Sequence, residues 1–495
     1  MHYISTRDAS LRYTAAEAIV QGLSREGGLF LPERIPQLSM DDLRALAGMT
    51  YEQRAVRVMK PYLDGFTEEE LAGFAARAYA VPGKFDHPGV APLYEYHKKT
   101  HFLELWHGPT CAFKDMALQM LPYLLTASLK KTGEEKTACI LVATSGDTGK
   151  AALEGFRDVE RTKILVFYPN GGVSEIQQLQ MVTQAGGNVG VCAVEGNFDD
   201  AQTGVKAIFS DEALREELAA RGYLLSSANS INWGRVLPQI VYYVSAYVDL
   251  VKAGRLQLGD PLNVCVPTGN FGNILAGYYA KRMGVPIDKL ICASNANNVL
   301  TDFLRTGVYD RNRPFHTTIS PSMDILISSN LERLLYLLCG SDREVAGYME
   351  SLRETGRYQV PETMLAAMQE TFRCGCCDDG RTMNTIGKFY EAGNYLMDTH
   401  TAVAATVLMD YRAASGDDTP AVVVSTASPF KFCSSVLTAL GEEEQDAGAA
   451  IIGQLARRTA VPAPAPLAGL QGREIRFRDV CRKEAMSARV KELLP

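Results

Sequence analysis

A single lysine, Lys114, stands between an aromatic and an acidic residue at the predicted start of a helix. The residues after Asp115 are helix formers, and the turn Gly108-Pro109 ends the element before it. Because a helix start carries partial positive charge and Phe113 excludes water, the neutral amine is favoured over the ammonium ion. A neutral amine can attack a carbonyl group and hold it as a Schiff base. Lys114 is therefore a candidate covalent anchor for a cofactor, although an isolated lysine is more often a solvated surface residue.

Two glycine-containing turns each follow a strand-like run and precede a helix-like one. Their residues are Ser145, Gly146, Asp147, Thr148 and Gly149 in the first turn, and Thr268, Gly269, Asn270, Phe271, Gly272 and Asn273 in the second. Glycine lets the backbone approach a ligand while free amides at the helix start point at it, so each turn is a candidate anion site. The alternative is that each is only a tight connection in an α/β fold. Neither turn matches a P-loop or a G-x-G-x-x-G fingerprint, which argues against a nucleotide site.

These motifs together resemble the threonine synthase family, whose members are fold-type II enzymes dependent on pyridoxal phosphate. The lysine motif at 108–115 is specific to the branch found in many bacteria and fungi, whereas the glycine turns are shared more widely. The pattern continues in order through 3–7, 26–30, 229–235, 321–324, 400–403 and 425–427. The resemblance runs from about Tyr3 to Phe432.

Three positions depart from the family pattern. Ser428, Thr399 and Asn298 stand where histidine, proline and aspartate are usual. None of them removes a proposed catalytic group. The departures concern details of the substrate site and leave the cofactor assignment unchanged.

The resemblance implies an α/β fold of the fold-type II, tryptophan synthase β-like class, with parallel sheets flanked by helices. The sequence pattern agrees, because its β-branched runs are short and continuous, as in a buried parallel sheet. The clearest predicted strands are 163–168, 189–194, 262–266, 290–293 and 421–425. Pro122 lies in the apolar run after Lys114, where it should kink the helix or end it early.

The resemblance, together with this pattern, implies three parts. Residues 1–95 form a helical threonine synthase N-terminal domain. Residues 96–435 form the PLP-dependent catalytic α/β domain, with a helical insertion at about 330–398. Residues 436–495 form a C-terminal tail, in which the proline-rich stretch 461–466 is a short, stiff linker.

The resemblance also implies a role for each candidate residue. Lys114 would be the catalytic residue and would hold pyridoxal 5'-phosphate covalently. Thr426 would lie near the pyridine nitrogen, and the cofactor phosphate would bind Gly269, Asn270, Phe271, Gly272 and Asn273. The substrate carboxylate and the cofactor ring oxygen would meet Ser145, Gly146, Asp147 and Thr148. The substrate's own phosphate would bind Asn229, Ser230 and Arg235, where a guanidinium suits bidentate pairing.

The expected reaction is the conversion of O-phospho-L-homoserine and water to L-threonine and phosphate. Such an enzyme is a carbon-oxygen lyase acting on a phosphate ester by β,γ-elimination and replacement, and it catalyses the last step of threonine biosynthesis. A related phospholyase that releases 2-oxobutyrate would share every cofactor residue. A non-catalytic α/β binding protein is the alternative from another class, against which Lys114 and the missing nucleotide fingerprints argue.

Composition limits the partners and the location. The chain has 495 residues, 46% of them hydrophobic, which is enough for more than one domain. A formal net charge of -7 without a basic run argues against nucleic acid or an anionic membrane as a partner. The chain has no apolar run of ~18 residues and no signal-like start, so we expect a cytoplasmic enzyme. Monomer and homodimer both remain open.

The eleven cysteines are scattered, and several lie in predicted strands, as expected for reduced thiols that act as small hydrophobes. Cys374, Cys376 and Cys377 form the one cluster with metal-binding chemistry. A tetrahedral zinc site needs a second ligand pair, which the sequence lacks, so no metal is expected. By resemblance, residues 372–386 form a surface helical segment.

Overall fold

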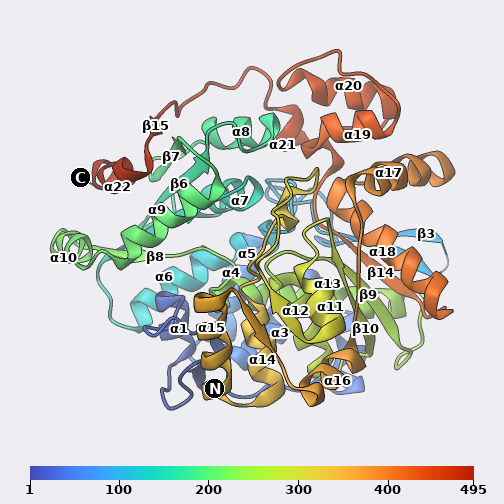
Figure 1. The fold of residues 1–495 in the computed structure, drawn as a ribbon, viewed down its shortest axis with the longest axis horizontal. Helices are drawn as coiled ribbons and strands as arrows, with labels where there is room; N and C mark the ends of the chain where they lie inside the picture. Colours follow the sequence, from blue (N-terminus) through green and yellow to red (C-terminus); the bar gives the residue numbers. More distant parts are fainter. Residues whose placement is uncertain (98, 495) are drawn as a thin grey trace.

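The computed structural model describes residues 1–97 and 99–494, which are organised around two mostly parallel sheets (Figure 1). The larger sheet has the strand order β13-β10-β9-β14-β4-β3, and only the pair β3 and β4 is antiparallel. Its strands are β3 (Leu93–His97), β4 (Thr100–Glu104), β9 (Leu262–Pro267), β10 (Ile287–Ser294), β13 (Phe372–Cys376) and β14 (Ala421–Ser425).

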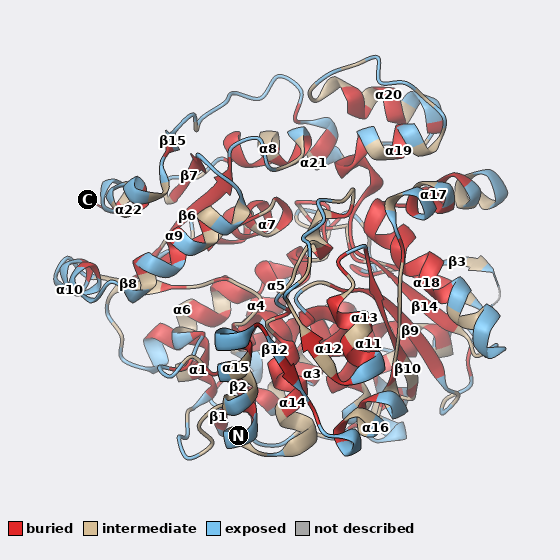
Figure 2. Ribbon diagram, viewed as in Figure 1, coloured by how far each residue is buried: buried red, intermediate tan, exposed pale blue. Residues whose placement is uncertain are grey.

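The smaller sheet is entirely parallel and has the strand order β15-β7-β6-β5-β8. Its strands are β5 (Thr137–Ala143), β6 (Thr162–Pro169), β7 (Val189–Val194), β8 (Tyr223–Ser226) and β15 (Val480–Cys481). The five strands that the sequence predicts most clearly are all present, so those predictions are confirmed. Their continuous apolar runs are buried, as both faces of a parallel sheet require (Figure 2).

Helices cover both sheets and fill the space between them. The long helix α11 (Trp233–Lys252) is buried along nearly its whole length and packs against α12 (Gly272–Arg282), which explains why most of its residues are apolar. The other helices of the catalytic region before residue 310 are α5 (Asp115–Leu118), α6 (Leu121–Lys131), α7 (Asp147–Phe156), α8 (Glu175–Val182), α9 (Phe198–Ser210), α10 (Glu212–Ala220) and α13 (Val299–Thr306). Helix α18 (Thr399–Ser415) packs against the larger sheet.

The N-terminal region is mostly helical, as the sequence predicts. Its helices are α1 (Ala15–Gln21), α2 (Met40–Ala47), α3 (Tyr51–Met59) and α4 (Glu68–Ala78). Each begins with a serine or threonine whose side chain closes a capping box with the residue three positions later. Helices α2 and α3 pack on α11. The short strands β1 (Tyr3–Ser5) and β2 (Phe30–Pro32) form an antiparallel pair, with β1 before α1 in the sequence and β2 between α1 and α2.

The predicted insertion at about 330–398 contains strands as well as helices. Its helices are α14 (Leu331–Cys339), α15 (Asp342–Thr355), α16 (Glu362–Thr371) and α17 (Asp379–Gly393). The strand β12 (Arg357–Gln359) pairs with β11 (Val308–Asp310). Residues 372–376 are the edge strand β13, so the expectation of a surface helical segment was wrong there. Phe372 is buried against the rings of Phe271 and Tyr278, and pairing with β10 decides the local structure.

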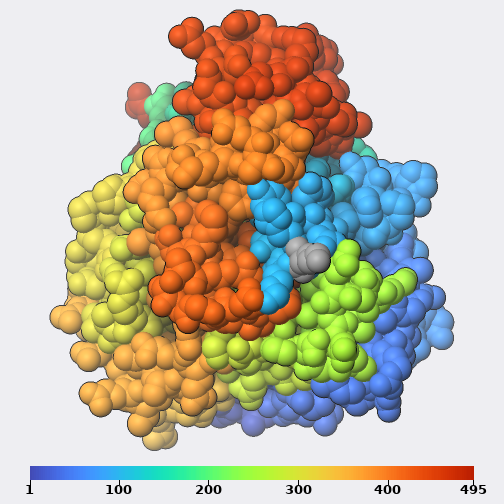
Figure 3. Space-filling view, turned by 90° about the vertical axis from the view of Figure 1, so that its right-hand side faces the viewer, coloured from blue at the N-terminus to red at the C-terminus, as the bar shows by residue number. Residues whose placement is uncertain are grey.

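Residues 436–495, expected as a tail, include ordered structure that joins the smaller sheet. Helices α19 (Cys433–Ala439), α20 (Ala450–Thr459) and α21 (Ala465–Ala468) form a lobe, red at the top of Figure 3. Beyond them β15 pairs in parallel with β7, and α22 (Met486–Leu493) packs against α9. In the described part of the chain, no helix is both long and apolar enough to cross a membrane.

Candidate active site

Lys114 is the N-cap residue of a very short helix. Helix α5 has four residues, and α6 begins at Leu121 with Pro122 in its first turn, so the predicted interruption of this run is confirmed. The ammonium group lies 4.7 Å from the centroid of the Phe113 ring, and the side chain is almost completely buried. Burial lowers the pKa of Lys114 to about 8 and is the largest cause of the shift. Desolvation, more than the field of so short a helix, therefore favours the neutral amine.

One carboxylate and one hydroxyl lie close to the Lys114 amine. Its Nζ atom lies 3.8 Å from Asp147 Oδ2 and donates a hydrogen bond of 3.5 Å to Ser322 Oγ. The positive charges of Lys431 and Arg235 lower the pKa of Lys114 further, while Asp147 opposes them. The amine thus sits where small changes in the surrounding charges alter its protonation near neutral pH.

Lys431 is a buried lysine that the sequence analysis missed. Its Nζ atom lies 2.7 Å from Asp147 Oδ1 and donates to the carbonyl oxygen of Thr110 at 2.9 Å. Gln177 donates to the same carboxylate oxygen. Burial would raise the pKa of Asp147, but the two lysines outweigh it and hold that pKa well below its usual range. A signal was available, because Lys431 stands between two phenylalanines in an otherwise apolar run.

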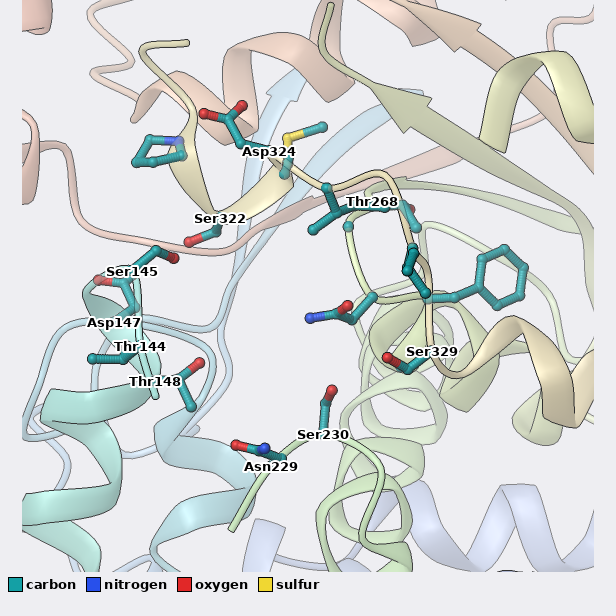
Figure 4. Close-up of a pocket in the computed structure, with 18 of the residues that line it drawn as sticks. Thr144, Ser145, Asp147, Thr148, Asn229, Ser230, Thr268, Ser322, Asp324 and Ser329 are labelled. Carbon is teal, nitrogen blue, oxygen red and sulfur yellow. The ribbon is translucent and has the colours of Figure 1, made fainter. Parts of the chain in front are cut away.

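The first glycine turn joins β5 to α7. Gly146 has a φ of +136°, and a Cβ atom there would lie 2.4 Å from the side chain of Gln177, so both conformation and space require glycine. The hydroxyl of Thr144 accepts hydrogen bonds of 2.9 Å from the amides of Gly146 and Gly149. These contacts fix the turn while Ser145, Asp147 and Thr148 face the cavity (Figure 4).

The second glycine turn joins β9 to α12. A Cβ atom on Gly269 would lie 2.6 Å from the carbonyl oxygen of Ser322, and Phe271 adopts a left-handed conformation with a φ of +61°. The side-chain oxygen of Asn273 accepts hydrogen bonds of 2.6 Å from both Tyr242 and Tyr243. This leaves the buried Nδ2 group of Asn273 as a donor without a partner among the described residues. A free donor at a helix start suits an anion.

Arg235 is a buried cation in the first turn of α11. One nitrogen donates to the carbonyl oxygen of Ala228 at 2.5 Å, and the Nε group has no partner among residues 1–97 and 99–494. No carboxylate of the described chain forms an ion pair with it, and burial lowers its pKa to about 10. Asn229 and Ser230 line the same part of the cavity. A buried guanidinium without a counter-ion has strong affinity for an anionic ligand.

These groups surround one cavity of about 500 Å³. Figure 4 shows Ser322 facing Ser145 and Asp147, whereas Asn229 and Ser230 reach the cavity from another side. The predicted site residues that line it are Lys114, Ser145, Asp147, Thr148, Asn229, Ser230, Arg235, Gly269, Asn270, Phe271, Gly272, Asn273 and Thr426. Gly146 is the one predicted site residue that shapes the turn without lining the cavity. The three departures from the family pattern, Ser428, Thr399 and Asn298, do not line it either.

Thr426 lies just beyond the end of β14 and is nearly buried. Its carbonyl oxygen accepts a hydrogen bond of 2.8 Å from the amide of Phe113, which joins the end of this strand to the lysine motif. The parallel strands β9 and β14 thus end beside the same cavity, where ligands of open α/β sheets usually bind.

A buried histidine also lines the cavity and was not assigned a role from the sequence. His400 Nδ1 lies 2.8 Å from Asp398 Oδ2, and its Nε2 atom accepts a hydrogen bond of 3.2 Å from the amide of Ser322. Asp398 also caps the start of α18. His400 therefore holds the Ser322 loop against Lys114, a contact that sequence spacing does not reveal.

A charged cluster supports the segment before Lys114. His107 Nδ1 lies 2.6 Å from Asp86 Oδ1, and its Nε2 atom lies 3.0 Å from Glu104 Oε2. Burial would lower the pKa of His107, but the hydrogen bonds to the two carboxylates raise it to about 9. Further along, Asp115 accepts two hydrogen bonds from Thr110, of 2.8 and 2.7 Å, which fixes the turn that delivers the lysine.

The cavity fits pyridoxal phosphate on its own chemistry. It holds a lysine whose pKa is lowered, a hydroxyl at the end of β14, and two separate groups of free donors suited to two anions. The cysteine cluster lies outside this cavity, and the described residues contain no group of three or more His, Cys, Asp or Glu side chains arranged to hold a metal ion. The eleven cysteines form no disulfide.

Three family models match the chain. The model described as "Threonine synthase N terminus" matches residues 2–79, "Pyridoxal-phosphate dependent enzyme" matches residues 85–427, and "Threonine synthase, C-terminal" matches residues 401–493. The last match extends the family likeness well beyond Phe432, where the sequence resemblance was expected to end.

Individual proteins agree with the family models. The chain is 40% identical to the human protein "Threonine synthase-like 1" over 89% of its own length, but it spans only 61% of that relative. It is 39% identical to threonine synthase of Pseudomonas aeruginosa, covering 88% of this chain and 90% of that one. The crystal structure of PLP-bound threonine synthase from Brucella melitensis superposes with a TM-score of 0.88 at 38% identity, covering 100% of this chain and 99% of that one.

Proposed function

The chain belongs to the threonine synthase family of pyridoxal-phosphate-dependent enzymes, and from this premise we propose that it converts O-phospho-L-homoserine and water to L-threonine and phosphate. One observation carries the proposal. The buried guanidinium of Arg235, which has no carboxylate partner among the described residues, lines the same cavity as Lys114 and the turn of residues 269–273. A substrate with a phosphate of its own, bound beside a cofactor phosphate, requires both anion sites.

One set of residues would hold the cofactor. Gly269, Asn270, Phe271, Gly272 and Asn273 would hold the cofactor phosphate at the start of α12, with the free Nδ2 group of Asn273 among the donors. Thr426 would face the ring nitrogen, and Lys114 would bind the cofactor covalently. When bound, pyridoxal phosphate supplies an electron sink for carbanions formed on the amino acid.

A second set of residues would hold the substrate. Asn229, Ser230 and Arg235 would bind its phosphate, and the start of α7 at Ser145, Gly146, Asp147 and Thr148 would meet its carboxylate. Asp147 is already paired with Lys431, so its negative charge does not face the substrate alone. The free amides at the helix start, together with Lys431 and Lys114, keep the local field positive.

Lys114 would move the protons. An amine whose pKa is about 8 can accept a proton from carbon and return it at another carbon near neutral pH. Ser322 Oγ, at 3.5 Å, is placed to orient the amine between these steps. The narrow, mostly enclosed position of Lys114 would limit access of water to the amine while the phosphate leaves.

Product analysis tests the proposal. Purified protein supplied with pyridoxal phosphate and O-phospho-L-homoserine should release phosphate and L-threonine in equal amounts. Phosphate accompanied by 2-oxobutyrate and ammonia would instead identify the related phospholyase. Absence of phosphate release, from protein shown to carry the cofactor, would reject both activities.

A further inference from the structure

The N-terminal motifs at residues 3–7 and 26–30 contact no part of the cavity, yet their side chains and backbone converge on helix α14. Arg7 forms a bidentate ion pair with Glu332, with Nε to Oε1 and Nη2 to Oε2 distances of 2.8 Å. The hydroxyl of Thr6 donates to Glu332 and accepts a hydrogen bond of 2.8 Å from the amide of Leu29. Glu332 thereby fixes the start of α14 to the N-terminal domain.

The next residue, Arg333, donates hydrogen bonds to two distant segments and to Asn330 at the start of its own helix. Its Nε group donates to the carbonyl oxygen of Phe30 at 2.8 Å, and Nη1 donates to the side-chain oxygen of Asn330. Its Nη2 group donates to the carbonyl oxygen of Ile231 at 2.6 Å. The side chain is fully buried, and burial lowers its pKa to about 10. Within the described chain it forms no ion pair with a carboxylate.

Asn330 extends this connection to the second glycine turn. Its backbone amide and its Nδ2 group both donate to the carbonyl oxygen of Asn270, at 3.1 and 3.0 Å. Ile231 directly follows Ser230 in the segment assigned to the substrate phosphate, while Asn270 belongs to the turn assigned to the cofactor phosphate. Arg333 therefore contacts the segment of one anion site directly and that of the other through Asn330, although it does not line the cavity itself.

We propose that Arg333 is a positioning residue that sets the two phosphate sites relative to each other and ties both to the N-terminal domain. This inference rests on the proposed function, since it assumes that these two segments bind phosphates. Donors that bind an anion must be held in place by their supporting contacts, and small displacements weaken binding. Five donors on one planar group can satisfy acceptors in three directions, which a lysine ammonium cannot reproduce with the same geometry.

The test compares variants that separate geometry from charge. Calorimetry measures binding of inorganic phosphate to the cofactor-loaded protein, alongside KM and kcat with O-phospho-L-homoserine. Arg333→Met removes both charge and hydrogen bonds, while Arg333→Lys retains the charge. We expect both to weaken phosphate binding by about tenfold or more, and to raise KM by a larger factor than they lower kcat.

Arg54 provides the matched control. It is a buried arginine on α3 that also connects the N-terminal region to the catalytic core, through a bidentate pair with Asp249 at 2.9 and 2.7 Å, but it does not contact either phosphate segment. Arg54→Met should lower the melting temperature and leave the phosphate affinity unchanged. Equal loss of phosphate affinity in Arg54→Met and Arg333→Met would overturn the inference, because general loosening of the domain would explain both.

Two further results would also overturn it. One is wild-type phosphate affinity in Arg333→Met, and the other is full affinity in Arg333→Lys, which would assign the effect to charge alone. If Arg333→Met does not fold, Asn330→Ala carries the same test, because it removes the acceptor for Arg333 and one donor to Asn270. A wild-type protein that binds phosphate without making threonine would reject the proposed function and leave this inference standing.

Discussion

The carboxylate of Asp147 lies between two lysines, with Oδ1 2.7 Å from Lys431 Nζ and Oδ2 3.8 Å from Lys114 Nζ. Lys431 and Asp147 are both shielded from solvent, so the pair keeps its charge in a region where isolated charges are costly. One carboxylate is thus shared by the amine proposed to react and by a second amine that only contacts protein.

Replacement of Lys431 should change the protonation of Lys114. The charge of Lys431 lowers the pKa of Lys114, so Lys431→Met should raise it and leave Asp147 to act on Lys114 alone. Capture of pyridoxal phosphate by the apoprotein requires the neutral amine, so the capture rate should rise with pH. The midpoint of this rise should lie near pH 8 in wild type and at higher pH in Lys431→Met. Breaking a buried pair should also cost about 3 to 5 kcal/mol of unfolding free energy.

Lys150→Met is the control for this shift. Lys150 is also buried and pairs with Glu154 at 3.2 Å, but its charge has no resolved effect on Lys114. It should lose stability while the pH midpoint stays in place. A capture midpoint unchanged in Lys431→Met would show that the two lysines are not coupled.

Lys114→Ala should abolish covalent cofactor attachment and turnover. The side chain lines the cavity, and its polar contacts with Asp147 and Ser322 are long, at 3.8 and 3.5 Å, so the melting temperature should change little. Borohydride treatment of the cofactor-loaded protein, followed by peptide mass analysis, should label the Lys114 peptide in wild type only. Cofactor label retained elsewhere in the variant, with activity, would remove Lys114 from its assigned role.

Arg235→Ala should impair use of the substrate phosphate and leave cofactor binding intact. Losing one partner of a desolvated charge pair lowers kcat/KM by roughly two to three orders of magnitude, and Arg235→Lys should recover only part of this. Phosphate at 100 times its Kd should stabilise wild type by about 2.7 kcal/mol, measured as a rise in melting temperature. The same rise in Arg235→Ala would show that phosphate binds elsewhere.

The His107 cluster should make stability depend on pH. The folded-state pKa of about 9 lies above the ordinary value of 6.5, so the stabilisation is complete below pH 6.5 and is lost as pH rises towards 9. His107→Gln should therefore be less stable than wild type by on the order of 2 kcal/mol at pH 6, and the difference should close near pH 9. Urea unfolding across this range measures it, and a difference independent of pH would contradict the assignment.

Thr426→Asp should place a carboxylate beside the ring nitrogen of the cofactor. Protonation of that nitrogen makes the ring a stronger electron sink, which should alter the ratio of 2-oxobutyrate to threonine, whereas Thr426→Ser should be mild. Chromatography of both products, at equal cofactor occupancy, gives the ratio. An unchanged ratio in Thr426→Asp would place Thr426 away from the ring nitrogen.

The sequence predicted five of the strands and the two glycine turns because their signals are local. Continuous apolar runs identify these strands, which belong to both sheets, and glycine followed by a helix identifies the turns at 146 and 269. Parallel topology then brings these turns and Lys114 to one cavity. The chemistry of the individual residues, combined with the family resemblance, selected site residues that all line this cavity except Gly146, although other residues line it as well.

The residues that were missed depend on contacts between distant segments. Lys431 reaches Thr110 across more than three hundred residues, and His400 meets Ser322 across 78. The edge strand β13 was wrongly expected to be helical, because its pairing with β10 is not encoded in its own five residues. Local pattern and spacing carry no information about such partners.

The smaller sheet can be completed only late in synthesis, because its edge strand β15 lies near the C-terminal end of the chain. Cys481 on β15 packs against Cys192 on β7, 289 residues earlier, so the β7 edge stays uncovered on the ribosome until residues near 480 have been made. An uncovered strand edge is a template for pairing with other chains. During that interval the edge is open to pairing with other chains, whereas the finished protein covers it with β15.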